Sequence, residues 1–127
     1  MGDSIQSFRD LRVWQSGMGI VESVYKLTGS FPARELYGLT SQVRRAAVSI
    51  PANIAEGHCR EQIKEYLNFL SIAQGSVAEL ETELEIAGRL EYIAPEPLGL
   101  LLKQLGNLGK QLRALLRALA NRTTVKG

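Results

Sequence analysis

Apolar residues recur at alternating intervals of three and four positions along most of the chain, a spacing that places them on one face of an α-helix. The pattern predicts four helices, at about residues 8–27, 39–56, 61–92 and 98–120, followed by a flexible tail over 121–127. No segment alternates apolar and polar residues with a period of two, so no strand is predicted.

The apolar seam of each predicted helix keeps an average spacing of about 3.5 residues, which favours packing at crossing angles of about 20°. In chain order the four seams are Leu11, Trp14, Met18, Val21 and Tyr25; Leu39, Val43, Ala47, Ile50 and Ile54; Tyr66, Leu70, Ala73, Val77, Leu80, Leu84 and Ala87; and Leu98, Leu101, Leu105, Leu108, Leu112, Leu115 and Leu119. Four amphipathic helices with short connections predict an all-α protein, an antiparallel up-down four-helix bundle that forms a single domain over residues 1–127.

Further apolar residues lie off these seams in the first and fourth predicted helices: Ile20, Val24, Leu27, Leu102 and Leu116. A lone bundle would expose some of them, and a contiguous exposed apolar surface indicates a partner or self-association. A wider core-facing stripe, which is normal for globular helices, explains them equally well. The sequence leaves both interpretations open.

Local signals mark where the predicted helices begin, bend and end. Ser7 and Asp10 have the spacing of a capping box at the start of the first helix. Pro51 lies inside the second helix, where a proline usually bends or ends a helix. Because the apolar period continues in phase from Ile50 to Ile54, we predict one continuous helix that is kinked at Pro51.

Composition places the chain among ordinary globular proteins. Its 127 residues fit one domain, and a net charge of +2 is too small by itself to indicate nucleic-acid binding. The single cysteine, Cys59, cannot form an intramolecular disulfide. The N-terminus lacks the features of a signal peptide, and no apolar run is long enough to span a membrane. We therefore expect a soluble, cytoplasmic protein.

Charge is unevenly divided between the last two predicted helices. Residues 61–96 contain eight acids and two bases, whereas residues 97–127 contain six bases and no acid. Four of these bases share one stripe, roughly opposite the leucine seam: Lys103, Lys110, Arg113 and Arg117. The stripe could bind nucleic-acid phosphates without reading sequence. It could equally be a solvated face attracted to the acidic helix of the same or a neighbouring molecule.

A second stripe, on the second predicted helix, is polar: Gln42, Arg45, Ser49, Asn53 and Glu56. The third helix offers possible hydrogen-bonding counterparts in Asn68, Ser71, Gly75 and Ser76. The stripe is either an ordinary solvent face or a partly buried polar network at a subunit interface or central channel. Buried polar networks of that kind fix helix register and oligomeric state.

No constellation of residues predicts catalysis. The Glu-x-x-His pairs of di-metal bundles are absent, as are phosphate-binding glycine loops. Glu56, His58 and Cys59 are close in sequence but form only a weak metal signal, and an adjacent Cys–His pair rarely aligns for proton transfer. We expect no enzyme activity, no metal and no cofactor.

The polar stripe lies within a longer motif, FPARELYGLTSQVRRAAVSIPANIAEG, from Phe31 to Gly57. This run resembles the signature of a bacterial four-helix bundle family that includes proteins encoded in intervening sequences of large-subunit ribosomal RNA genes. It also resembles the accessory variability determinant proteins of diversity-generating retroelements. Further matches are Phe8, Leu11 and Trp14, and the run FLSIAQGSVAELETEL from Phe69 to Leu84. The resemblance extends over nearly the whole chain.

The resemblance implies a ring-like homopentamer without known catalytic activity, whose retroelement members associate with a reverse transcriptase and with nucleic acid. We therefore predict a self-assembling scaffold that binds nucleic acid, with RNA the expected kind, or a nucleic-acid enzyme such as a reverse transcriptase. Lys103, Lys110, Arg113 and Arg117 are the predicted contacts, and Arg44 adds to them. The alternative is a protein–protein interaction module in which the basic stripe makes subunit contacts.

Overall fold

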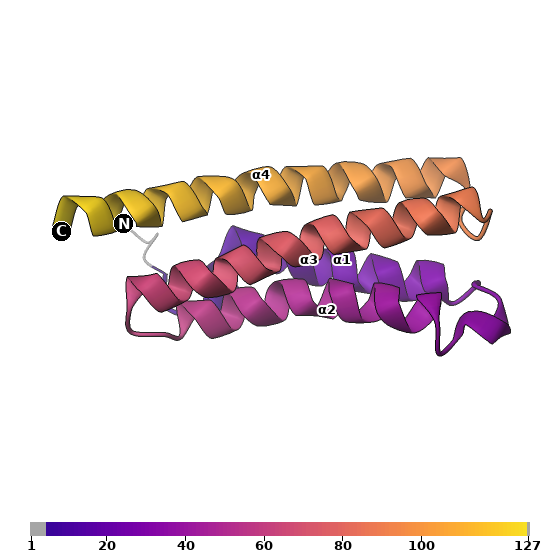
Figure 1. Ribbon diagram of the computed structural model, residues 1–127, viewed down its shortest axis with the longest axis horizontal. Helices are drawn as coiled ribbons and strands as arrows, with labels where there is room; N and C mark the ends of the chain where they lie inside the picture. The colour runs from indigo at the N-terminus through magenta and orange to yellow at the C-terminus, as the bar shows by residue number, and fades with distance from the viewer. Residues whose placement is uncertain (1–4, 127) are drawn as a thin grey trace.

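The computed structural model describes residues 5–126, and the side chains of residues 5–122. Two short 3₁₀ helices accompany four long α-helices: η1 (Phe8–Asp10), α1 (Arg12–Thr28), η2 (Ala33–Glu35), α2 (Leu39–His58), α3 (Ile63–Arg89) and α4 (Pro95–Lys126). The long helices lie side by side (Figure 1), and the described residues contain no strand. The prediction of an all-α chain with four helices and no strand is confirmed.

The four helices do not pack against one another equally. α2 packs most extensively on α3, and the pairs α1–α2 and α3–α4 follow, whereas α1 and α4 contact each other least. α2 and α4 share no contact within the described residues, so they lie diagonally across the bundle. The bundle is therefore least closed along the side between α1 and α4.

The core is built from the predicted seams of α2, α3 and α4. Most of these seam residues are fully buried, and the few partly exposed ones, such as Tyr66 and Leu115, pack against the core. Burial of apolar surface at roughly 25 cal/mol per Å² makes this core the main source of stability. No helix of the described chain is both long enough and apolar enough to cross a membrane.

The predicted seam of α1 was wrong. The buried residues of α1 are instead Val13, Gly17, Ile20, Val24 and Thr28, and they include two residues that we had placed off the seam. The reason lies in α2, because a Cβ atom at Gly17 would meet the ring of Pro51 at 3.4 Å. α1 therefore approaches this proline closely, and a pattern of large apolar residues alone does not reveal that approach.

Because the buried face of α1 is displaced, the predicted seam residues lie at or near the surface. Met18 is 39% exposed and Tyr25 is 45% exposed, while Trp14 and Val21 are only partly buried. The remaining off-seam residues, Leu27, Leu102 and Leu116, are partly buried against the core. For all five off-seam residues, the interpretation as a wider core-facing stripe is therefore correct.

Helix boundaries follow the local signals with some shifts. The Ser7–Asp10 capping box forms, but it starts the short helix η1, and Leu11 is extended before α1 begins. α2 passes through Pro51 without interruption, as predicted. α3 ends at Arg89, and Glu91 adopts a left-handed conformation with φ of 65° in the turn that follows.

The last helix is longer than the sequence pattern indicated. It begins at Pro95 rather than at about residue 98, because a proline is well tolerated in the first turn of a helix, where its missing N–H has no partner to lose. It continues to Lys126, over the segment that we had predicted to be a flexible tail.

Candidate nucleic-acid interface

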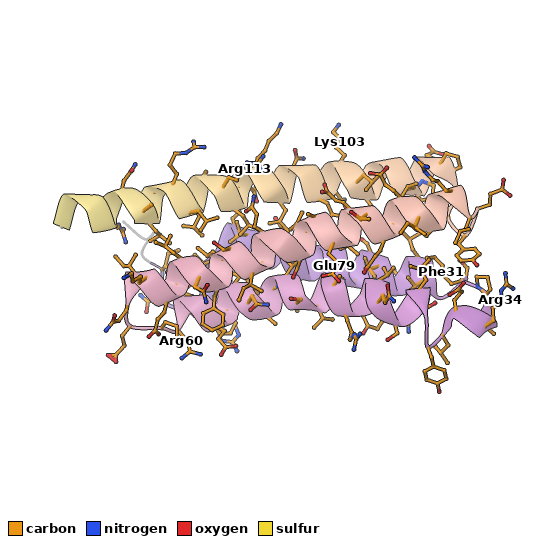
Figure 2. The ribbon with its side chains drawn as sticks, in the orientation of Figure 1. Phe31, Arg34, Arg60, Glu79, Lys103 and Arg113 are labelled. Carbon is orange, nitrogen blue, oxygen red and sulfur yellow. The ribbon has the colours of Figure 1, made fainter. Side chains whose placement is uncertain are left out.

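The four bases of the predicted stripe, Lys103, Lys110, Arg113 and Arg117, lie on the exposed side of α4. Lys103 points away from the bundle in Figure 2. The opposite side of the helix carries the buried residues Leu105, Leu108 and Leu112, which fix its rotation. The described part of α4 thus presents its cations to solvent along about 21 Å, at 1.5 Å of rise per residue.

These cations are not neutralised within the chain. The one salt bridge among the described residues joins Arg60 Nη2 to Glu56 Oε2 at 2.7 Å, on the surface at the end of α2. None of the described acids of α3 forms an ion pair with a base of α4, although the two helices are neighbours. The attraction between the acidic and basic helices therefore does not produce contacts within one molecule, which leaves the stripe available to an anionic ligand.

Arg44, which we had added to the stripe, lies elsewhere. Its Nε donates a hydrogen bond of 2.8 Å to Thr28 Oγ1, and its guanidinium group lies 4.6 Å from the centroid of the Tyr25 ring. Both contacts tie α2 to the end of α1. Because α2 and α4 make no described contact, the structure does not bring Arg44 together with the four bases of α4.

The polar stripe of α2 separates into a partly buried centre and exposed ends. Ser49 Oγ lies 2.8 Å from Ser76 Oγ on α3, and Asn53 Nδ2 donates to the carbonyl oxygen and the hydroxyl of Ser49 at 2.8 and 2.9 Å. Gln42, Arg45 and Glu56 are exposed.

Of the four counterparts that we expected on α3, only Ser76 makes a described hydrogen bond to this stripe, and Asn68, Ser71 and Gly75 are exposed. The network therefore connects α2 to α3 within one chain.

Sequence reasoning missed the most unusual member of this α2–α3 seam, Glu83. Its side chain is only 7% exposed, and its Oε1 has no hydrogen-bond partner among the described atoms. Burial, together with the charge of Glu79 and a hydrogen bond to it, raises the pKa of Glu83 to about 7, whereas the positive charge of Arg45 acts in the opposite direction. In the sequence, Glu83 is one acid among many on α3, and no signal distinguishes it.

The residues near His58 do not assemble a reactive group. The imidazole of His58 packs edge-on against the ring of Tyr66, with 5.8 Å between centroids. Cys59 is exposed, and Glu56 is held by Arg60. The described part of the chain contains no group of three side chains placed to hold a metal ion.

Apolar residues that are exposed (Met18, Tyr25 and Val48) or partly buried (Trp14 and Val21) lie on α1 and α2, on the other side of the bundle. We call these residues together the α1–α2 apolar surface. Val48 is 43% exposed, and it lies between Arg44, which contacts Tyr25, and Pro51, which contacts Gly17. These two contacts place Val48 beside the exposed side chains of α1.

Together, the fold and its surfaces define a class of protein: a small helical bundle with a basic outer helix and no assembled reactive group among its described residues. Residues 9–114 match the model of the 23S rRNA-intervening sequence protein family, so the chain belongs to that family. No curated protein sequence matches the chain significantly.

Among solved structures, the chain is similar to a protein of unknown function from the S23 ribosomal protein family of Bacteroides thetaiotaomicron. The two are 24% identical in sequence and superpose with a TM-score of 0.74. The similarity covers 82% of this chain and 97% of the other. At this level of identity, the likeness supports the fold.

Proposed function

We propose that the protein is a non-catalytic, self-assembling scaffold that binds nucleic acid through the basic stripe of α4. RNA is the expected kind of nucleic acid. The observation that carries the proposal is the exposure of Lys103, Lys110, Arg113 and Arg117 without a described acidic partner. Cations arranged along one helix neutralise phosphates without reading base sequence. A nucleic-acid enzyme, such as a reverse transcriptase, would meet the scaffold on the bound strand.

We further propose that up-down bundles of this kind, bent at Pro51, assemble into a ring-like homopentamer. The α1–α2 apolar surface supports assembly, because exposed apolar patches rimmed by polar residues mark interaction sites. A closed ring satisfies a head-to-tail contact without forming open filaments. The ring would repeat the α4 stripe around the assembly, so that weak phosphate contacts gain strength through effective concentration.

The test compares the wild type with a variant in which Lys103, Lys110, Arg113 and Arg117 are all replaced by Gln. Binding of RNA and DNA oligonucleotides is measured across a salt series, and oligomer mass is measured by light scattering. A matched control removes the same charge from exposed positions elsewhere: Arg12, Arg34, Lys64 and Arg89.

We expect wild type and control to bind tightly at low salt, with affinity that falls steeply as salt rises. The stripe variant should lose most of this binding and reduce the salt slope by about one for each phosphate contact removed. Equal binding by the stripe variant, or no binding by the wild type at low salt, contradicts the proposal. If the stripe variant dissociates into monomers, the stripe makes subunit contacts and the protein-interaction function takes its place.

Assembly is tested separately at Val48. The substitution Val48→Glu places a charge in the α1–α2 apolar surface and keeps a good helix former in α2. We expect the mass in solution to fall from that of the oligomer to that of the monomer while helicity by circular dichroism is unchanged. The control Tyr37→Ser removes a side chain that is 93% exposed and should leave the mass unaltered. An intact oligomer in the Val48 variant contradicts this role for the surface.

A further inference from the structure

A groove runs along the side of the bundle where α1 and α4 contact each other least. It has a volume of about 450 Å³, with Ile20 and Leu108 as its apolar floor. A smaller cavity of about 230 Å³ continues it toward the start of α4 and shares Ser23 and Gln104 with it. At 1.5 Å per residue, the fifteen positions from residue 97 to residue 111 give the combined groove a length of about 21 Å.

The walls of this groove are polar and small. α1 contributes Ser16, Gly19 and Ser23, and α4 contributes the carboxamides of Gln104, Asn107 and Gln111. A Cβ atom added at Gly19 would meet no other atom within 4 Å, so the groove is open at this point.

Among the described atoms, Oε1 of Gln111 is buried without a hydrogen-bond partner. An unsatisfied buried acceptor is costly, so a turn of the Gln111 side chain that lets this oxygen meet a donor in the groove would relieve that cost.

The amides of the groove lie beside the basic stripe of α4. At 100° per residue, Lys103, Asn107 and Lys110 follow one another on a single side of the helix, and Gln104 and Gln111 lie next to them toward α1. On the opposite wall, Lys26 of α1 lines the smaller cavity. The groove therefore has cations on both rims, hydrogen-bonding amides on its wall and apolar side chains at its floor.

We propose that the α1–α4 groove binds the bases of a short single-stranded segment of nucleic acid, whose phosphates lie along Lys103 and Lys110. This inference rests on the proposed function and extends it, because it assigns some preference for particular bases to a protein otherwise expected to bind only phosphates. A carboxamide carries both a donor and an acceptor, so Asn and Gln side chains can pair with base edges, adenine above all. The length of the groove corresponds to about six nucleotides at ~3.4 Å per stacked nucleotide.

A strand is a better occupant of this groove than a protein helix. A helix from another protein would bury the three amides of α4 against its own surface, where each would need a new partner. In a single-stranded segment, the unpaired base edges offer many hydrogen-bond partners to these amides. In a duplex the same edges are paired, so they are not available to a narrow groove. The cations on both rims match a strand with phosphates along its length.

The test uses a groove variant that removes the amides and keeps every charge: Gln104→Met, Asn107→Leu and Gln111→Met. A second variant, Gly19→Leu, fills the groove without removing an amide. The control makes the same kind of change at two exposed positions on and beside α3, Gln62→Met and Asn68→Leu. The probes are oligonucleotides of equal length made of adenine, cytosine or uracil nucleotides, and an abasic strand, each measured at low and moderate salt.

We expect the wild type and the control to bind the adenine strand about tenfold or more tightly than the abasic strand. Each amide that pairs with a base should contribute a factor of about five or more to this preference. Both groove variants should bind all strands alike, with the salt slope of the wild type. An unchanged preference in both groove variants overturns the inference and leaves the proposed function intact, as does a wild type that binds all strands equally. Failure of every strand to bind overturns the proposed function as well.

Discussion

The seam between α2 and α3 and the side between α1 and α4 differ more than the similar apolar spacing of the helices suggests. Along the first, the two helices approach so closely that a Cβ atom at Gly57 would lie 2.8 Å from Phe69 Cβ. Along the second, the helices leave a groove, and a Cβ atom at Gly19 would meet nothing within 4 Å. One glycine is therefore required by packing, whereas the other borders empty space.

Polar groups follow the same division. In the α2–α3 seam, Ser49 bonds to both Ser76 and Asn53, although Oε1 of Glu83 has no described partner. In the α1–α4 groove, a ladder of amides faces an opening, and one amide oxygen has no described partner. The two sides therefore differ in openness, and the open α1–α4 side is where we propose that a ligand binds.

The largest expected effect concerns Glu83, the buried carboxyl of the closed seam. Its raised pKa of about 7 means that the folded state holds a proton that the unfolded chain releases near pH 4.5. Stability should therefore fall as pH rises from about 4.5 to about 7 and then level off. Glu83→Gln removes this dependence and should raise the free energy of unfolding by about 3 kcal/mol above pH 7. Urea unfolding at pH 5 and pH 8 measures the change.

The control for that experiment is Glu85→Gln, because Glu85 is exposed on the same helix. It should leave the pH dependence in place. A wild type whose stability does not change between pH 5 and pH 8 would contradict the assignment. The groups that face Glu83 are Glu79 on α3 and Arg45 on α2, so Arg45→Gln should raise the pKa of Glu83 further.

The next effect contrasts the two glycines. Gly57→Ala forces a methyl group against Phe69 and against the backbone oxygen of Tyr66, and overpacking of this kind costs about 2 kcal/mol. Gly19→Ala meets no atom and lowers the conformational entropy of the unfolded chain, so it should stabilise the protein by about 0.5 to 1 kcal/mol. Thermal unfolding of the two variants gives both signs. Equal effects from the two substitutions would remove the distinction between the closed and open sides.

A smaller effect is expected from Ser76→Ala, which removes the hydrogen bond to Ser49. The loss should be about 1 kcal/mol, because Ser49 keeps its contact with Asn53. Ser71→Ala, at an exposed position on the same helix, serves as the control and should be nearly neutral. Denaturant unfolding of both variants tests whether the network stabilises the single chain. If Ser76→Ala leaves the free energy of unfolding unchanged, the network does not stabilise the single chain, and only an intermolecular role remains for it.

The smallest effect is expected from Pro51→Ala. α2 is continuous through this residue, so the substitution should keep the helical content measured by circular dichroism. It should also straighten the bend that we predict there, because it removes the clash of the proline ring with the preceding turn. A crystal structure of the variant with unchanged helix geometry would show that the proline does not bend α2.

Much of the fold was readable from spacing. The heptad seams of α3 and α4 gave their buried faces correctly, because a run of leucines at intervals of three and four admits one core-facing side. α1 was misread because two apolar stripes overlap on it, and the choice between them depends on Gly17 meeting Pro51 of another helix. Long-range contacts of this kind leave no periodic signal in the sequence.

The candidate site was predictable in part for the same reason. The exposed bases of α4 follow from their position opposite the leucine seam. The groove beside them could not be predicted from the sequence, because it depends on how far α1 lies from α4. Its amides, Gln104, Asn107 and Gln111, look like ordinary surface residues in the sequence. Arg44 was assigned to the stripe from the sequence, but the structure places it elsewhere. Its contacts with Thr28 and Tyr25 depend on the register of α1 and α2.

The central claim is that nucleic acid binds the α1–α4 side of the molecule and leaves the α2–α3 seam uncovered. Photo-crosslinking of RNA that contains 4-thiouridine, followed by mass spectrometry of the attached peptides, tests this location most directly. The account predicts cross-links in peptides from α4 and from the groove-lining part of α1, and none in peptides from α2. Cross-links concentrated on α2 and α3, with α4 unlabelled, would contradict it.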